Sequence, residues 1–390
     1  MKKNIAVLFG GKSVEHEVSV ITGMQVMENI DKSKYNVVPV FIDKEGRWFT
    51  GDELLEFKNF KEKNLKNIKE IVVTPTYNEN RIFSHPDKVG LFSKKFSEKI
   101  DAAFIALHGT NGEDGTVQGV FELMNIPYVS AGVIGSSVGM DKILMKDVYK
   151  SHGLPIVDYT WFFRKAWEDD KNAVLDKIES KLKYPVFVKP SNLGSSVGIT
   201  RAKDRESLEE SIEVAIRYDR KIIVEAAVEN PREINCAVMG YDNKVKASLC
   251  EEPIGWKELL TYEDKYVNSN SKGSKNGGRN IPADLSSEKA KEIQETAMAS
   301  FMAIDCKGNA RIDFLMDEDE KIYVNEINTQ PGSVGYYLWE PMGINFTQLV
   351  DELLDIAYAV HEEKNKNMYS YDVDLFDKVN LGKSSKAGKM

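Results

Sequence analysis

Two pairs of polar residues, Arg311 with Asp313 and Glu326 with Asn328, stand out in residues 309–332, which read NARIDFLMDEDEKIYVNEINTQPG. Two runs of β-branched and aromatic residues flank the acidic stretch 317–320, a pattern that predicts a β-hairpin. Because side chains alternate along a strand, each polar pair shares one face of its strand. Folding about the turn places Asp313 opposite or diagonal to Glu326, within roughly 4.5–8 Å.

Two carboxylates at that separation repel each other, so one would bind a proton unless a cation lies between them. With the amide oxygen of Asn328 they form an all-oxygen set that suits Mg²⁺ carrying nucleotide phosphates. The alternative is a solvated polar face on an ordinary hairpin. If the two acidic residues were the only evidence, this alternative would be favoured. Asn328 in register and Arg311 upstream favour a metal–phosphate site instead.

Glycine-rich loops follow two predicted strands of the N-terminal part. GGKSVEHE, residues 10–17, matches neither a Walker motif nor GxGxxG. Glu15 in this loop either stabilises a helix dipole or holds a substrate amine, and the residues alone favour the dipole role. His108 begins HGTNGEDG, at the carboxyl edge where open α/β sheets bind ligands. For His108 a structural role and a ligand contact both stay open.

A third polar loop, KPSNLGSSVG, begins at Lys189 between two predicted strands. Backbone amides and two hydroxyls beside a lysine can form an anion nest for phosphates. A polar hairpin tip is the alternative, but lysines rarely end an apolar strand without a partner. Lys142, in the run Met140-Asp141-Lys142, is by itself a typical helix-surface lysine.

Bulk properties narrow the class of protein. The chain has 390 residues and a formal net charge of −9, with acidic and basic residues interspersed. This composition argues against a nucleic-acid partner. The cysteines Cys236, Cys250 and Cys306 show no CxxC spacing, which is typical of a reducing compartment. No apolar stretch is long enough to span a bilayer, so we expect a cytoplasmic protein without a membrane partner.

Strands alternate with helices in the opening residues, which predicts an α/β fold with a parallel sheet. We expect strands at 4–9 and 35–42 around a helix with Ser13 as its N-cap, and a buried strand at 101–109. The charged, irregular chain over 43–99 should contain excursions and short elements. Further helices are predicted at 141–152, 205–218, 286–304 and 345–359. These elements suggest domains at 1–132, 133–230 and 231–362 and a frayed polar tail at 363–390. The long polar loop at 262–282 is typical of either a functional lid or a disordered segment.

Taken in order, these segments resemble the ATP-grasp superfamily and, more closely, the D-alanine–D-alanine ligases. The resemblance runs from about residue 4 to residue 359 and rests on GGKSVEHEVSV, LHGTNGEDGTVQG, Met140-Asp141-Lys142, KPSNLGSSVG, YEDKY and ARIDF…NEINTQPG. It implies an ATP-grasp architecture, in which a parallel-sheet N-terminal domain precedes two sheet-containing domains that sandwich ATP. It also implies a reaction: ATP phosphorylates the carboxylate of one D-alanine, and the amine of a second attacks the acyl phosphate.

The resemblance assigns roles to individual residues. Asp313, Glu326 and Asn328 would hold two Mg²⁺ ions, which Mn²⁺ can replace. Lys142 and Lys189 would bind ATP phosphates, with Ser195, Ser196 and Lys265 around the γ-phosphate. The adenine-binding hinge would contain Glu225, Ala226 and Val228. Glu233 would lie at the ribose. Glu15 would hold the first substrate's ammonium, His108 would lie near its carboxylate, and Arg311 with the Gly332 amide would stabilise the oxyanion. Glu15, Ser195 and Tyr266 would form a hydrogen-bonded set beneath the lid.

The acceptor half of the site departs from the family pattern. The lid tyrosine, Tyr266, favours an amine acceptor, yet Tyr337 stands where the family usually has a serine that binds the second substrate's carboxylate. A phenol hydroxyl can donate a hydrogen bond to a carboxylate, but its ring occupies volume there. We therefore expect D-alanyl-D-alanine formation for peptidoglycan synthesis. The alternatives are an amide ligase with a different acceptor and a non-catalytic ATP-binding regulator. Relatives are commonly homodimers.

Overall fold

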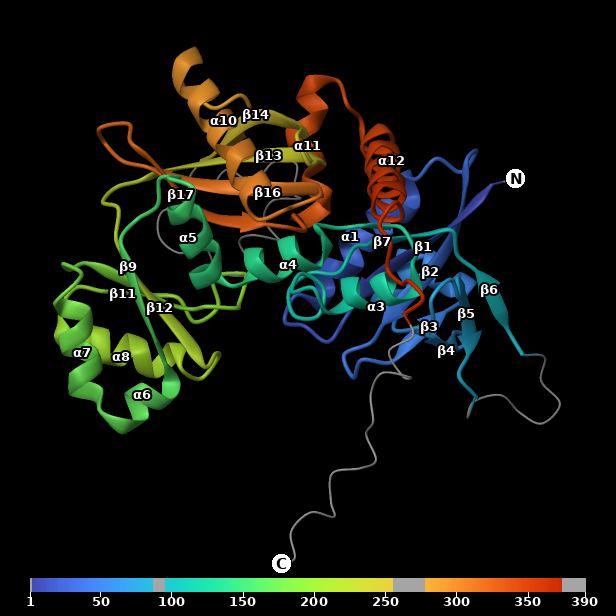
Figure 1. The fold of residues 1–390 in the computed structure, drawn as a ribbon, viewed down its shortest axis with the longest axis horizontal. Coiled ribbons are helices and arrows are strands. Elements are labelled where there is room, and N and C mark those ends of the chain that lie inside the picture. Colours follow the sequence, from blue (N-terminus) through green and yellow to red (C-terminus); the bar gives the residue numbers. More distant parts are fainter. Residues whose placement is uncertain (1, 87–94, 255–277, 374–390) are drawn as a thin grey trace, which may run out of the picture.

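Three β-sheets lie in a row in the computed structural model, which describes residues 2–86, 95–254 and 278–373 (Figure 1). An eight-stranded sheet from the N-terminal part lies at one end and a four-stranded sheet at the other. A five-stranded sheet from the C-terminal part lies between them. The prediction of an α/β fold with three sheet-containing parts is confirmed. The domain limits at 132, 230 and 362 stay a prediction.

The eight-stranded sheet has the order β6-β5-β4-β3-β2-β1-β7-β8. Its elements are β1 (Lys3–Gly10), α1 (His16–Asn29), β2 (Tyr35–Ile42), β3 (Trp48–Thr50), the 3-10 turn at Asp52–Leu55, α2 (Phe57–Lys61), β4 (Lys69–Val73), β5 (Arg81–Ser84), β6 (Ser97–Lys99), β7 (Ala102–Ile105), α3 (Thr116–Met124), β8 (Tyr128–Val129) and α4 (Gly132–Met140). Strand β1 pairs in parallel with β2 and with β7, so the predicted β-α-β opening is confirmed.

Within the described part of 43–99, the expected short elements include strands β3, β4, β5 and β6, which extend the sheet from β2 in antiparallel fashion, each pairing with the next. Two other local predictions in this sheet need correction. The strand predicted at 101–109 ends at Ile105. Ser13 is not the N-cap of α1: its hydroxyl accepts the Glu15 amide at 3.1 Å in a local turn, and Glu15 takes the cap position.

The four-stranded sheet is antiparallel throughout, with the order β11-β10-β12-β9. Its elements are β9 (Tyr159–Phe163), α6 (Arg164–Asp169), α7 (Lys171–Glu179), β10 (Val186–Pro190), β11 (Thr200–Ala202), α8 (Arg205–Ala215) and β12 (Lys221–Ala226). One face packs its apolar residues, such as Val188 and Val224, against these helices. Alternation leaves Lys189 and Glu225 on the opposite face.

The five-stranded sheet, in the order β15-β14-β13-β16-β17, is also antiparallel. Its elements are α5 (Lys142–Ser151), β13 (Arg232–Tyr241), β14 (Lys244–Ile254), β15 (Gly278–Asn280), α10 (Ser287–Ala303), β16 (Gly308–Met316) and β17 (Ile322–Asn328). Ser286 caps α10 by accepting the Lys289 amide at 3.1 Å. The apolar face, including Ile312 and Phe314, is buried in one core with residues of α5 and α10.

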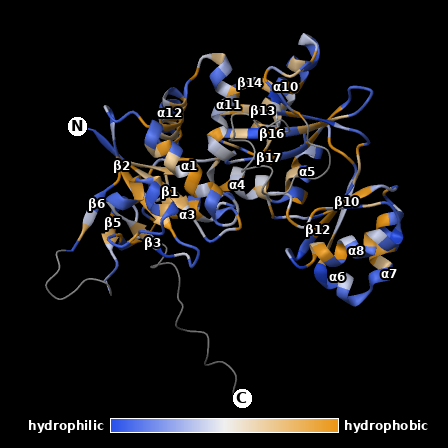
Figure 2. Cartoon of the chain, turned by 180° about the vertical axis from the view of Figure 1, so that it is seen from behind, coloured by the Kyte–Doolittle hydropathy of each residue, from blue (hydrophilic) through white to orange (hydrophobic). Residues whose placement is uncertain are grey.

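Helix α12 (Phe346–Lys364) joins the two larger sheets. It follows a 3-10 turn at Gly332–Gly335, α11 (Tyr336–Trp339) and a second turn at Glu340–Met342, and it runs beyond the predicted end at 359. Leu353 and Leu354 lie in one cluster with Val7 of the N-terminal sheet and Met239 of the C-terminal sheet. By contrast, the cluster of the four-stranded sheet contains only residues from 162–226. Figure 2 shows hydrophobic residues gathered both around β1 and on α7 and α8.

None of the helices within the described ranges is long and apolar enough to cross a membrane.

Leu353→Ala should lower the free energy of unfolding by about 2–5 kcal/mol, because it opens a cavity in the core that α12 shares with two sheets. Leu353 is fully buried, and Trp339 in the same cluster gives a fluorescence signal for urea-induced unfolding. Glu362→Ala, at an exposed position of the same helix, is the matched control and should change stability by less than about 0.5 kcal/mol. Equal effects of both substitutions would contradict the shared core.

Candidate active site

The predicted hairpin is formed by β16 and β17, in the predicted register. Asp313 pairs with Glu326 and Arg311 pairs with Asn328, with an irregularity directly after Asp313. Asn235 of β13 lies on the other side of Asp313 and pairs in turn with Glu251 of β14. A row of polar residues therefore crosses four strands on the face away from α10.

The protein itself supplies cations to both carboxylates of the hairpin. Arg311 donates from Nε and Nη2 to Asp313 at 2.7 Å each, and Asn328 Nδ2 donates to Asp313 at 2.9 Å. Lys142 Nζ lies 3.5 Å from Glu326 Oε2. The described residues contain no group of three or more His, Cys, Asp or Glu that could hold a metal, because the third donor here is an amide. Two carboxylates and an amide oxygen on one sheet face nevertheless fit a hard cation such as Mg²⁺.

Lys142 is positioned by the start of α5. Asp141 caps this helix by accepting the amides of Ile143 and Leu144 at 3.1 and 3.2 Å. The same carboxylate accepts Ser191 Oγ at 2.8 Å and pairs with Lys221. Lys142 Nζ donates to the carbonyl of Leu193 at 2.9 Å, so it spans from the glycine loop to Glu326. Lys142 is buried, and its interpretation as an ordinary surface lysine is wrong.

Lys189 lies at the end of β10 and has the partner that its apolar surroundings require. Its Nζ donates to Glu225 Oε2 at 2.7 Å and to Asn325 Oδ1 at 3.3 Å. Glu225 also lies 3.3 Å from Lys146, a lysine that the sequence pattern did not single out. Two lysines on one carboxylate hold the pKa of Glu225 below its ordinary value although burial acts to raise it.

The glycine loop after Lys189 reaches across to the N-terminal part. Ser195 and Ser196 have φ values of 55° and 58°, the left-handed conformation of an anion nest. The hydroxyl of Ser195 donates to Glu15 Oε1. A Cβ on Gly194 would lie 3.2 Å from Glu15 Oε2, so a side chain there would crowd this contact. Glu15 is the N-cap residue of α1, and its side chain makes no cap hydrogen bond. Its role in stabilising the helix dipole stays a prediction. Lys265 and Tyr266 lie outside the described residues, as does most of the predicted lid.

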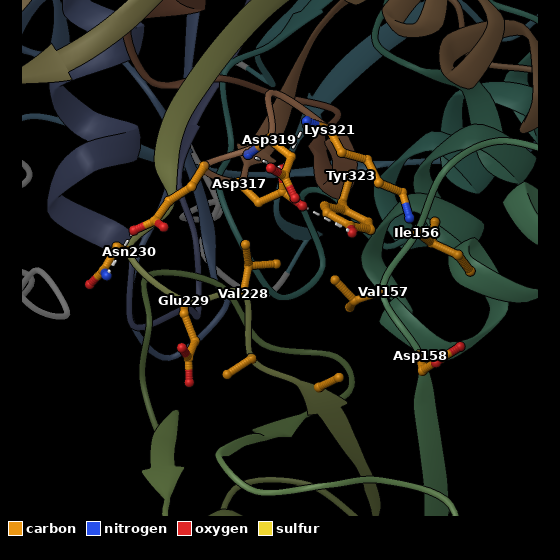
Figure 3. Close-up of a pocket in the computed structure, with 13 residues that line it drawn as sticks. Ile156, Val157, Asp158, Val228, Glu229, Asn230, Asp317, Asp319, Lys321 and Tyr323 are labelled. Atoms are coloured by element: carbon orange, nitrogen blue, oxygen red, sulfur yellow. Dashed lines mark hydrogen bonds between the residues drawn. The ribbon is translucent and has the colours of Figure 1, made fainter.

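The predicted hinge connects β12 to β13 beside a cavity of about 510 Å³ (Figure 3). Val228 lines this cavity, and Tyr323 lies across it with its hydroxyl 3.3 Å from Asp317 Oδ2. The Ala226 amide donates to the Asp158 carbonyl at 2.8 Å, which fixes one edge of the hinge. Glu233 is exposed on β13.

His108 is held as a neutral imidazole. Burial lowers the pKa of His108 to about 4, although the Gln330 backbone acts in the opposite direction. Its Nε2 lies 2.8 Å from Thr22 Oγ1, and its amide donates to Ser19 Oγ at 2.8 Å. A neutral ring can make a hydrogen bond to a substrate but no ion pair.

Glu113 is a site residue that the sequence reasoning missed, although it lies within the HGTNGEDG loop. It accepts the Gly109 amide at 2.8 Å and the Gln330 amide at 3.0 Å, which ties this loop to the turn after β17. Burial and the charge of Glu15 raise the pKa of Glu113 to about 8. The feature of the sequence that could have identified Glu113 is its position as an acidic residue between glycines.

The segment after β17 brings Gly332 and Tyr337 towards Arg311. Gly332 begins the 3-10 turn, and Arg311 Nη1 lies 3.4 Å from the Tyr337 hydroxyl. Arg279, a second residue not expected from the sequence, lies with its Cζ 4.0 Å from the centre of the Tyr337 ring. Its Nη1 is 3.3 Å from Glu251 Oε1. Tyr337 therefore lies between two guanidinium groups.

Comparison with known proteins agrees with this geometry. The family described as D-ala D-ala ligase N-terminus matches residues 4–131, and D-ala D-ala ligase C-terminus matches residues 148–355. The D-alanine–D-alanine ligase of Thermosipho africanus is 41% identical over 96% of this chain and 98% of its own length. That of Acetivibrio thermocellus is 42% identical over 95% and 99%.

Two solved structures share the arrangement of the three sheets. The D-alanine–D-alanine ligase of Coxiella burnetii aligns with a TM-score of 0.77 and 32% identity, covering 94% of this chain and 96% of that one. The VanG D-Ala:D-Ser ligase of Enterococcus faecalis also aligns with a TM-score of 0.77, at 30% identity, covering 92% and 100%.

The fold is therefore the ATP-grasp fold, and the site is that of an ATP-dependent, ADP-forming ligase. Within this class, the chain belongs to the D-alanine–D-alanine ligase family.

In the unmutated protein the free energy of unfolding should fall as the pH rises. Glu113→Gln should remove this fall. The ordinary pKa of 4.5 is raised to about 8 in the folded protein, so between these values only the unfolded chain releases the proton. Stability therefore falls through this window, by at most about 1.4 kcal/mol per pH unit, and is constant above it. Urea titrations at pH 5 to 9 without nucleotide or metal measure this slope. An identical slope in the variant would contradict the assignment.

Proposed function

We propose that the chain joins two D-alanines into D-alanyl-D-alanine, with ATP as the energy source, for peptidoglycan synthesis. One observation carries the proposal. Direct contacts connect the oxygen donors of the β16–β17 hairpin with the two lysines and the glycine loop: Lys142 reaches both Glu326 and the Leu193 carbonyl, Lys189 reaches Asn325, and Ser195 donates to Glu15. The names of the relatives from Thermosipho africanus and Acetivibrio thermocellus support the same substrate.

ATP would lie between the four-stranded and five-stranded sheets. Lys142 and Lys189 would bind its phosphates, with Ser195, Ser196 and Lys265 around the γ-phosphate. The backbone from Glu225 through Ala226 to Val228 would contact adenine, and Glu233 would reach the ribose. The left-handed backbone at Ser195 and Ser196 supports this role, because successive amides in that conformation point towards an anion.

Asp313, Glu326 and Asn328 would hold the metal, two Mg²⁺ ions by family resemblance, which Mn²⁺ can replace. When bound, the metal would neutralise negative charge on the phosphates. Arg311 would stabilise the oxyanion that develops during attack, together with the Gly332 amide. Its guanidinium is held in place by two hydrogen bonds to Asp313, which supports a fixed rather than a mobile donor.

Glu15 would hold the ammonium of the first D-alanine, and His108 would contact the carboxylate through a hydrogen bond. Ser195 fixes the Glu15 carboxylate through its hydroxyl, and Tyr266 would complete this set. The homodimeric state and cytoplasmic location stay part of the proposal, and size-exclusion chromatography tests the former.

The decisive experiment measures phosphate release from ATP with D-alanine as the sole amino acid and weighs the product by mass spectrometry. Phosphate release with formation of the dipeptide is the expected result. ATP binding without phosphate release would overturn the proposal in favour of a non-catalytic regulator.

Glu326→Gln should reduce turnover by at least about 100-fold, because it removes a metal charge without changing side-chain volume. The thermal unfolding midpoint without metal should change little, since the contact from Glu326 to Lys142 is partly exposed. Asn365→Ala, far along the chain at the end of α12, is the control for general damage. Normal turnover of the Glu326 variant would rule out the hairpin as the metal site.

A different acceptor is the second candidate, and the surroundings of Tyr337 favour testing it. One relative, the VanG enzyme, is named as a D-Ala:D-Ser ligase. Adding D-serine, D-lactate or other amines to D-alanine would identify such an acceptor by product mass.

Tyr337→Phe should raise the KM for the second substrate about fivefold, as expected for loss of one hydrogen bond, and leave the KM for ATP unchanged. The ring and its contact with Arg279 stay in place, so only the hydroxyl near Arg311 is removed. Initial rates across D-alanine concentrations separate the two substrate sites. An unchanged acceptor KM and product profile would remove Tyr337 from the acceptor site.

A further inference from the structure

Lys146 is a buried cation with no assigned role. It lies on α5, one turn after Lys142, and its side chain is 0% exposed. Its Nζ lies 3.3 Å from Glu225 Oε1 and donates to the Asn325 carbonyl at 3.4 Å. Burying an ammonium group is costly unless it is paired. These contacts therefore explain how the protein can bury the Lys146 ammonium group.

Lys146 reaches Glu225 from a different structural unit. Its neighbours Met145 and Tyr149 are part of the core beneath the five-stranded sheet. Glu225 lies on β12, whose apolar residues belong to the separate core of residues 162–226. Contacts from α5 and β17 to that unit include Lys146–Glu225, Asp141–Lys221, Asp141–Ser191 and Lys189–Asn325. These four contacts are polar, and two of them are ion pairs between charged side chains.

The charges around Glu225 are unequal. Its carboxylate is 3% exposed and has Lys146 on Oε1 and Lys189 on Oε2. One carboxylate faces two ammonium groups here, and including Glu326, which also acts on Lys146, together with its partner Lys142 still leaves one positive charge in excess. That excess positive charge lies on the face of the four-stranded sheet from which Lys189 projects. A bound anion would balance it.

We propose that Lys146 is a positioning residue for nucleotide binding. Lys146 pairs with one oxygen of Glu225 and so prevents that carboxylate from fully neutralising Lys189. Lys189 therefore stays available to a nucleotide phosphate. The same contact holds β12, and with it the hinge that follows, against α5. This inference rests on the proposed function, since it takes Lys189 to be a phosphate-binding lysine.

The test compares Lys146→Gln with Lys146→Arg and with the control Lys150→Gln, which changes an exposed lysine one turn further along α5. Calorimetry with ADP and Mg²⁺ should show a Kd about tenfold higher for Lys146→Gln, within the roughly 5–150-fold range that is typical of coupling between two sites. Lys146→Arg should recover most of the affinity because it keeps the charge. The control should bind as the unmutated protein does. In steady state, the KM for ATP should rise more than kcat falls, while the KM for D-alanine stays unchanged.

A second variant distinguishes positioning from general damage to the fold. If Lys146 acts through Glu225, then Glu225→Gln combined with Lys146→Gln should bind ADP more tightly than Lys146→Gln alone, because Lys189 is released. Additive losses in the double variant would overturn the inference, and so would an equal ADP Kd for Lys146→Gln and the unmutated chain. Failure of the unmutated chain to bind ADP would instead overturn the proposed function and this inference with it.

Discussion

The register between β16 and β17 is the constraint on which the site depends. A slip of one residue would turn Glu326 and Asn328 towards α10 and bring Ile327 into the site. The opposite face prevents such a slip, because Ile312, Phe314 and Val324 are buried in the core beneath the sheet. Apolar packing on one face thus fixes the position of oxygen ligands on the other.

Charge compensation is the second property of the site. Arg311 pairs with Asp313, Lys142 pairs with Glu326, and Lys146 and Lys189 both contact Glu225. Each of these three carboxylates thereby has a cation supplied by the fold. The site can hold these charged groups close together without a ligand, and the phosphates and metal of a nucleotide would then exchange partners with groups that are already in place.

The sequence was most informative where local pattern and chemistry coincide. The hairpin, its register and the parallel β1–β2 pair follow from alternation and β-propensity, which depend on neighbouring residues. Lys142 and Glu15 were harder: taken alone, each suggested a surface lysine or a helix-stabilising acid, and only tertiary structure shows that Lys142 is buried against Leu193 and that Glu15 accepts the Ser195 hydroxyl. Lys146 and Arg279 could not be found from spacing, since their partners lie far away in the chain. Glu113 carried a local signal as an acidic residue between glycines, but its partner Gln330 lies far away in the chain. The short elements expected within 43–99 were not specified as strands, because short pieces at a sheet edge gain their stability from the neighbour rather than from their own sequence.

Helix α12 has a consequence for how the protein is made. The N-terminal strands are among the first residues to leave the ribosome, yet their core includes Leu353, Leu354 and Ala357 near the end of the chain. At ordinary synthesis rates the apolar surface of β1 waits roughly 10 to 45 seconds for that helix after β8 is complete. The unit around 162–226 has its own core and can form while the ribosome is still working. The other face of the N-terminal sheet has a core of its own, formed by residues 6–126, so it is the face of β1 in the cluster shared with α12 that depends on the last helix for protection from water. That face is covered last, after the core of the four-stranded sheet can already be complete.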